Sequence, residues 1–124
     1  MVTITNIARA RRTPMEQRGH TVPLVNPEMG ARHVDVHVNE LRPTGPDGRY
    51  HYHPESENVY IVLRGTGRLI AEGREYTLQK DDVVFIPAGD RHSLSARGDE
   101  EFVIIEIYAP APARFVPVED AAGR

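Results

Sequence analysis

The chain has 124 residues, a formal net charge of −3 and no cysteine, and 40% of its residues are hydrophobic. This length fits one globular domain, the acidic balance gives no general attraction to nucleic acid or anionic membranes, and apolar runs of about five residues cannot span a bilayer, which takes roughly 20. Without cysteine, disulfides and thiolate metal sites are excluded, so a metal would need nitrogen and oxygen ligands. Because the first residues also lack the apolar core of a signal peptide, we expect a soluble, cytoplasmic protein with no nucleic-acid or membrane partner.

The N-terminal quarter predicts a strand followed by an irregular connection. Residues 2–7 alternate apolar and polar side chains, which is the period-two pattern of a strand. Such a strand must join a sheet, either of its own chain or of a partner, and pairing across a two-fold axis would form a homodimer. The arginine-rich stretch 9–18 is either a solvated connection or a patch for an anionic partner; the lack of interleaved aromatic residues favours the connection. Pro23, Pro27 and Gly30 are expected to break the segment that follows.

Residues 33–41 predict the next strand, with two possible orientations. Polar and apolar side chains alternate there, with His33, Asp35, His37 and Asn39 on one face and Val34, Val36 and Val38 on the other. A half-buried antiparallel strand normally turns its polar face to water, so we expect the histidines to be exposed. In the alternative, the polar face lines a ligand cavity and His37 contacts the substrate.

Further strands are predicted between turn signals over the rest of the chain, at residues 59–63, 68–71, 74–79, 83–86, 92–97 and 102–108. Glu72 and Gly73 are typical of a tight hairpin turn. The strands at 59–63 and 83–86 are expected to be buried. Glu106 interrupts an apolar strand, and a buried carboxylate there would need a partner. Short strands without a helical stripe, internal repeat or domain boundary predict an all-β barrel or sandwich.

The histidines suggest a metal site. On a strand, His51 and His53 project from one face, about 7 Å apart, and imidazole binds zinc, iron, nickel and copper. His92 follows a turn that contains Pro87 and Gly89. Three histidines are typical of a metal site with open coordination positions.

These two segments resemble the two sequence motifs of the cupin family. In the first, G-x5-H-x-H-x(3,4)-E-x6-G, the matching residues are Gly45, His51, His53 and Gly65. In the second, G-x5-P-x-G-x2-H-x3-N, they are Pro87, Gly89 and His92. The chain departs from the motifs at three positions, with Asn58 at the glutamate, Asp81 at the second motif's glycine and Ala96 at its asparagine.

The resemblance covers roughly residues 34–109. It implies an antiparallel double-stranded β-helix, a jelly-roll barrel, as one domain over residues 1–124, with a core at about 34–109, an N-terminal strand arm at 1–32 and a C-terminal tail at 110–124. It implies a homodimer, a small-molecule ligand or substrate, and a divalent iron, manganese, zinc or nickel ion. The implied metal ligands are His51, His53, Asn58 and His92.

The fourth ligand position has three candidates. Asn58 occupies the motif position, Glu57 is its neighbour, and water is the third possibility; on a regular strand Glu57 and Asn58 point to opposite faces. Asparagine carries no charge, so the metal would be held less tightly and would favour an anionic ligand. Additional candidates to line the cavity are Tyr60, Val62, Glu106 and Tyr108.

The resemblance implies an enzyme of oxygenase, isomerase or lyase type that transforms a small, possibly anionic, metabolite. The alternative is a non-catalytic protein that binds or senses a sugar or another small molecule. No residue of the sequence identifies the catalytic acid or base.

Overall fold

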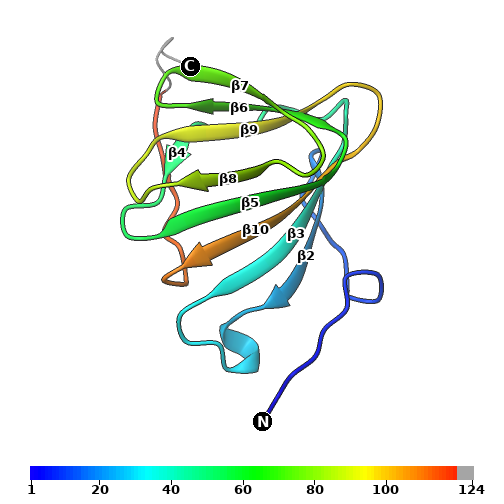
Figure 1. Cartoon of the computed structure of the whole chain (residues 1–124), viewed down its shortest axis with the longest axis vertical. Helices are drawn as coiled ribbons and strands as arrows, with labels where there is room; N and C mark the ends of the chain where they lie inside the picture. Colours follow the sequence, from blue (N-terminus) through cyan, green and yellow to red (C-terminus); the bar gives the residue numbers. More distant parts are fainter. Residues whose placement is uncertain (120–124) are drawn as a thin grey trace.

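The computed structural model describes residues 1–119, which form two packed antiparallel sheets (Figure 1). The six-stranded sheet A has the order β1 (Thr13–Pro14), β2 (Gly19–Val25), β3 (Asp35–Leu41), β10 (Phe102–Ala109), β5 (Glu57–Arg64) and β8 (Val83–Ile86). The five-stranded sheet B has the order β11 (Val116–Pro117), β4 (His51–Tyr52), β9 (His92–Arg97), β6 (Thr66–Ala71) and β7 (Arg74–Leu78). The predicted all-β jelly-roll barrel is confirmed. The end of the predicted tail, residues 120–124, lies outside the described residues.

The core lies between the sheets because alternate side chains of both sheets point inward. This inner cluster contains Leu41, Tyr60, Val62, Leu69, Leu78, Ile86, Leu94, Ala96, Phe102 and Ile104. A second cluster covers part of the outer face of sheet A and is formed by Val22, Leu24, Val38 and Val103. Within residues 1–119, the one short helix is the 3₁₀ turn Pro27–Met29, and no helix is long and apolar enough to cross a membrane.

The N-terminal region differs from the prediction in two ways. Residues 2–7 form no strand in this chain, because no sheet edge of the same chain runs beside them; Figure 1 shows the N-terminus extending away from the barrel. Residues 19–25, expected to be broken at Pro23, form β2 and pair with β3. The register of β2 shifts between Pro23 and Val25, which accommodates a residue that has no N–H to donate. Sheet A therefore begins at Thr13.

Two predicted orientations are also wrong. His33 is exposed as expected, but His37 points into the barrel together with Asn39, while Val38 is buried in the outer cluster. This reversal occurs because both faces of β3 are covered, one by apolar side chains and the other by a polar cavity. The strand at 83–86 was expected to be buried, but β8 is the edge of sheet A, and Val83 and Phe85 are 68% and 58% exposed.

Two glycines with similar backbone angles test how tightly the barrel's turns are packed. Gly65 has a φ of 83°, and a Cβ there would lie 2.3 Å from the carbonyl oxygen of Glu101. Gly73 has a φ of 78°, but a Cβ there would meet no described atom within 4 Å. We expect Gly73→Ala to lower the free energy of unfolding by about 1 kcal/mol, the cost of a left-handed alanine. Gly65→Ala should cost about 3 kcal/mol or more, because the backbone must also move. Urea denaturation of both variants measures the difference, and equal losses would contradict the predicted clash.

Candidate metal centre

Strand pairing brings the three histidines together inside the barrel. His51 on β4 lies directly opposite His92 on β9 in the antiparallel register, and His53 follows β4 by one residue. One ring nitrogen from each of the three histidines lies within 4.8 Å of the other two. These three residues come from distant parts of the sequence, yet their ring nitrogens lie close enough together to bind one metal ion.

Hydrogen bonds to backbone carbonyls orient all three rings in the same way. The Nδ1 atoms of His51, His53 and His92 lie 2.7, 2.7 and 2.9 Å from the carbonyl oxygens of Arg49, Arg114 and Asp90, respectively. A carbonyl only accepts hydrogen bonds, so each Nδ1 must carry the proton, and each Nε2 keeps its lone pair. In the described chain, Nε2 of His53 and of His92 are buried and have no hydrogen-bond partner. Buried, unpaired lone pairs of this kind fit a metal ion.

Burial keeps two of these rings neutral. It lowers the pKa of His51 to about 4, and the neighbouring His92 and His53 rings add to this shift. Burial is also the largest cause that lowers the pKa of His92. Neutral imidazole is the form that binds metal, so at neutral pH His51 and His92 need not lose a proton before they bind an ion.

The two candidates for the protein's fourth ligand have different environments. Asn58 is completely buried, whereas Glu57 is exposed, as expected for neighbours on a strand. The Nδ2 of Asn58 donates to Oε2 of Glu106 at 3.1 Å, which leaves Oδ1 buried without a partner among the described residues. This orphaned oxygen suits a divalent ion, and the position of Asn58 as a fourth ligand remains a prediction.

Glu106 places a buried carboxylate beside Asn58. Its Oε1 accepts hydrogen bonds from Nε2 of His37 at 3.0 Å and Nδ2 of Asn39 at 2.8 Å. Burial alone would raise the pKa of Glu106, but the hydrogen bond and charge of His37, helped by Tyr108 and Asn58, lower it to about 2. A carboxylate thus lies one hydrogen bond from Asn58, and the weaker hold on a metal expected from an uncharged ligand there stays a prediction. As predicted, the buried Glu106 has partners.

His37 links this buried carboxylate to the surface. Its Nδ1 lies 2.8 Å from Oδ1 of Asp35, which is partly exposed. Burial disfavours the charged ring, but the hydrogen bonds and charges of Glu106 and Asp35 outweigh it and raise the pKa of His37. His37 and Asn39 thus form a polar wall inside the barrel. This is the alternative orientation, in which the polar face of the strand lines a cavity.

A cavity of about 340 Å³ lies beside the histidines, and sequence reasoning found only part of its lining. Tyr60, Glu106 and Tyr108 line it as predicted, while Val62 belongs to the inner core. Arg18 also lines the cavity and donates from Nη2 to the carbonyl of Leu94 at 3.0 Å, although its stretch was interpreted as a solvated connection. Phe115, from the predicted tail, stacks on His51 with ring centroids 4.2 Å apart. No local sequence pattern marks Arg18 or Phe115, since only the fold brings them to the site.

The architecture is that of a jelly-roll barrel with a histidine cluster inside. The Cupin domain profile matches residues 37–108, which is more than half of the chain. The protein therefore belongs to the cupin family, as the motifs predicted.

Several curated proteins resemble parts of the chain. The tetracenomycin polyketide synthase protein TcmJ of Streptomyces glaucescens is 32% identical over 98 residues, covering 77% of this chain and 65% of TcmJ. An uncharacterized protein of Aquifex aeolicus is 36% identical over 61 residues, covering 49% of this chain and 50% of that protein. The chain thus spans between half and about two thirds of these relatives.

Solved structures share the fold at lower identity. The polyketide cyclase RemF of Streptomyces resistomycificus has a TM-score of 0.81 and 20% identity, covering 99% of this chain and 89% of RemF. KdgF of Halomonas sp. has a TM-score of 0.78 and 14% identity, covering 89% of this chain and 94% of KdgF. At these identities the superpositions establish the fold alone.

Chelation should destabilise the metal-loaded protein. An ion that binds only the folded state at 100 times its dissociation constant adds about 2.7 kcal/mol to the free energy of unfolding. We expect EDTA to lower the melting temperature by several degrees, and His51→Ala or His92→Ala to remove this effect. His33→Ala, at an exposed histidine outside the cluster, serves as the control. If His51→Ala and His92→Ala each retained a full equivalent of metal, the cluster would not be the site.

The pair of Asn58 and Glu106 can be tested by exchanging their charges. In the metal-free protein, Asn58→Glu places a second carboxylate beside Glu106 and should lower the free energy of unfolding by about 1–4 kcal/mol. Adding Glu106→Gln should restore most of this stability. The double variant again has a single carboxylate, which now lies on β5 instead of β10. Metal affinity, measured by calorimetry, should rise in both variants. An unchanged affinity would mean that position 58 does not face the metal, leaving Glu57 or water as the fourth ligand.

Proposed function

We propose that this protein is a metal-dependent enzyme that transfers protons at a carbon next to a carbonyl group of a small anionic metabolite. This reaction class includes isomerisation and aldol-type ring closure. The observation that carries the proposal is the histidine cluster, whose lone pairs are turned inward. The cavity beside it is lined by the cationic side chain of Arg18 and by groups that can carry protons, namely His37, Glu106 and Tyr108.

His51, His53 and His92, with Asn58, would hold the metal. A bound divalent ion would act as a Lewis acid that polarises the substrate carbonyl and makes the neighbouring C–H more acidic. The chain supports this arrangement by fixing each ring through a backbone carbonyl, so that the ligands need no rearrangement to bind.

Arg18 favours an anionic substrate. Its guanidinium is half-buried at the cavity wall; burial lowers its pKa, although the charge of Glu106 counteracts this effect. An arginine keeps its charge even there and can hold a carboxylate through paired hydrogen bonds. The substrate would thus be oriented with its carboxylate toward Arg18 and its carbonyl toward the histidines.

The chain of Glu106, His37 and Asp35 would accept the proton that leaves the carbon, and Tyr108 would donate a proton to the substrate. Burial and Glu106 raise the pKa of Tyr108 far above its usual range, so its hydroxyl remains a proton donor. The centroid of its ring lies 4.8 Å from that of His53, so Tyr108 would lie beside the proposed metal ligands. His37 bridges Glu106 and Asp35 and can pass a proton between the buried cavity and the partly exposed Asp35.

The similarity to TcmJ supports a carbonyl substrate. TcmJ is described as a protein of a polyketide synthase, and polyketide chains carry carbonyl groups whose neighbouring carbons lose protons readily. The same likeness would suit an isomerase or a lyase whose reaction begins with proton removal. The rival function is a sugar- or metabolite-binding protein without catalysis.

The test is metal-dependent exchange of carbon-bound protons. In D₂O, the metal-loaded protein should accelerate exchange at C3 of 2-oxobutanoate, followed by NMR, and chelation should abolish the acceleration. Tyr108→Phe should slow exchange about a hundredfold. Arg18→Gln should slow the proton exchange of 2-oxobutanoate about tenfold or more. It should slow the exchange of 2-butanone much less, because 2-butanone has no carboxylate.

The other candidate functions give different results. Oxygen uptake with the iron-loaded protein, without proton exchange, would indicate a dioxygenase and contradict the proposed reaction. Tight binding of the oxo acid, with no exchange above the metal-free rate, would favour the binding protein.

A further inference from the structure

The carbonyls that hold the three histidine rings lie at very different distances along the sequence. For two of the rings, the carbonyl belongs to the residue two positions before the histidine, so the local chain fixes the bond. The carbonyl that holds His53 belongs to Arg114, 61 residues further along. The orientation of His53 therefore depends on a distant segment, residues 110–118, here called the strap.

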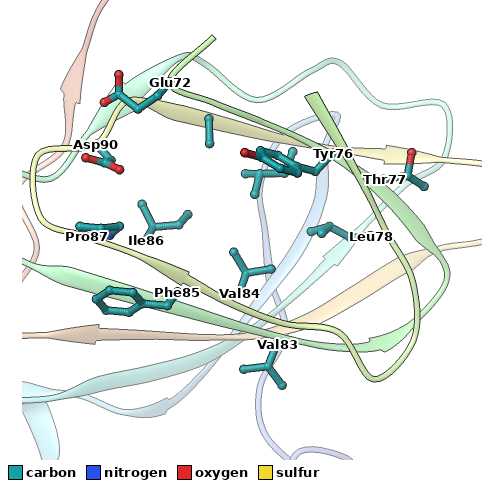
Figure 2. Close-up of a pocket in the computed structure, with 12 residues that line it drawn as sticks. Glu72, Tyr76, Thr77, Leu78, Val83, Val84, Phe85, Ile86, Pro87 and Asp90 are labelled. Carbon is teal, nitrogen blue, oxygen red and sulfur yellow. The ribbon is translucent and has the colours of Figure 1, made fainter. Parts of the chain in front are cut away.

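The turn that holds His92 does not depend on the strap. Figure 2 shows its Asp90 in the bend between β8 and β9, beside Glu72. The backbone N–H of Glu72 donates to the carbonyl of Arg91 at 2.9 Å, and the N–H of Arg91 donates back to Oε1 of Glu72 at 3.0 Å. This turn is thus fixed to the hairpin between β6 and β7.

The strap runs from the end of β10 in sheet A to β11 in sheet B, along one end of the barrel (Figure 1). It is anchored near both of its own ends. The buried hydroxyl of Ser56 donates to the carbonyl of Pro110 at 2.6 Å. The N–H of Val118 donates to the carbonyl of Tyr50 at 2.9 Å.

Between these anchors, two consecutive strap residues contact two of the three candidate metal ligands. The carbonyl of Arg114 accepts the hydrogen bond from Nδ1 of His53 at 2.7 Å. The ring of Phe115 stacks on His51, with ring centroids 4.2 Å apart and 21° between the ring planes. The guanidinium of Arg114 also forms two hydrogen bonds with Glu55, in the loop that follows His53.

Phe115 separates the histidine cluster from the surface. It lines the cavity that contains His51 and also a second cavity, likewise of about 340 Å³, that contains His53. Phe115 is 52% exposed, whereas His53 and His92 are 3% and 1% exposed. The strap therefore forms part of the wall between the buried rings and solvent.

The strap is held less firmly than the barrel. Its strand β11, Val116–Pro117, has two residues and lies at the edge of sheet B. The side chains of Arg114 and Glu55 are both more than half exposed, and an exposed ion pair adds little to stability. Short edge segments of this kind open locally while the rest of a domain stays folded.

We propose that the strap is the gate of the metal site and that Arg114 and Phe115 are its positioning residues. This inference rests on the metal site of the proposed function. Closing the strap fixes His53 through the carbonyl of Arg114 and covers the neighbouring ring with Phe115. Lifting it removes both contacts, while the turns that hold His51 and His92 stay folded. The open site then has two oriented ligands instead of three, and an ion is exchanged with solvent in this state.

The tautomer of His53 links the strap to metal affinity. A ring held by the carbonyl of Arg114 carries its proton on Nδ1, which leaves the lone pair of Nε2 for an ion. Without that acceptor, the proton can move to Nε2 and the ring can rotate. An open strap therefore weakens one ligand without any change in the barrel.

The absence of cysteine permits a reversible lock on the strap. Val116 lies directly opposite Tyr52 in the antiparallel pair of β11 and β4, and the Cα atoms of such partners are about 4.5–5.5 Å apart, which suits a disulfide. Tyr52 lies between two of the histidines in the sequence, so its side chain points to the opposite face. We expect the oxidised Tyr52→Cys, Val116→Cys variant to lose Co²⁺ to excess EDTA about tenfold more slowly, or slower still, than after reduction. The loss is followed by visible absorbance.

The matched control places the same lock elsewhere. Ile61 and Val83 are direct partners on β5 and β8, away from the strap. The Ile61→Cys, Val83→Cys variant should lose Co²⁺ at the same rate when oxidised and when reduced.

Removing the aromatic contact should have the opposite effect. Phe115→Ala should lose Co²⁺ about tenfold faster than the unchanged protein, whereas Phe85→Ala, at an exposed ring on β8, should not. In the metal-free Phe115→Ala protein, ¹⁵N NMR should show mixed tautomers at His53 and a retained Nδ1 proton at His92.

Each outcome separates the gate from the proposed reaction. Equal Co²⁺ loss from the oxidised and reduced lock, or an unchanged His53 tautomer in Phe115→Ala, would overturn the gate. Strap-dependent Co²⁺ loss without proton exchange at carbon would support the gate and contradict the proposed reaction. A protein that binds no Co²⁺ at the histidines would overturn both.

Discussion

The polar interior of the barrel depends on one buried carboxylate. Glu106 lies in the middle of an otherwise apolar strand, and an ionised group in that position must be surrounded by donors. His37, Asn39 and Asn58 supply them from the two strands on either side of β10. In satisfying Glu106, these side chains take fixed orientations, and the carbonyl oxygen of Asn58 is left facing away from it. The interior around Glu106 is therefore polar, while the inner core cluster is apolar.

The histidine cluster follows a related principle. Each ring uses one nitrogen to donate to a backbone carbonyl, and this choice decides which nitrogen keeps its lone pair. The carbonyls come from three different segments, including residue 114 near the end of the described chain. The three rings are thus oriented by backbone geometry, while the buried negative charge lies on Glu106 of the opposite sheet. Separating these two tasks leaves the cavity wall free for Arg18 and Tyr108, the residues through which a substrate would be recognised.

The two ends of the outer face of sheet A differ in how well they are covered. The outer cluster covers one end of sheet A, while Val83 and Phe85 leave the β8 end apolar and exposed. An edge strand with exposed Val83 and Phe85 is a liability for a protein that stays monomeric.

The sequence by itself determined the class of fold, the identity of the three histidines and most strand positions, because alternation, turn residues and the motif spacings are local signals. It also indicated that Glu106 would need partners if buried. It could not show which face of β3 is inside, since both faces of that strand are covered and alternation alone does not distinguish a core from a polar cavity. Nor could it find Arg18, Phe115 or the strand through Pro23, because these depend on contacts between distant segments. The tertiary structure decided that Asn58 donates to the buried carboxylate of Glu106, since only strand pairing places β5 beside β10.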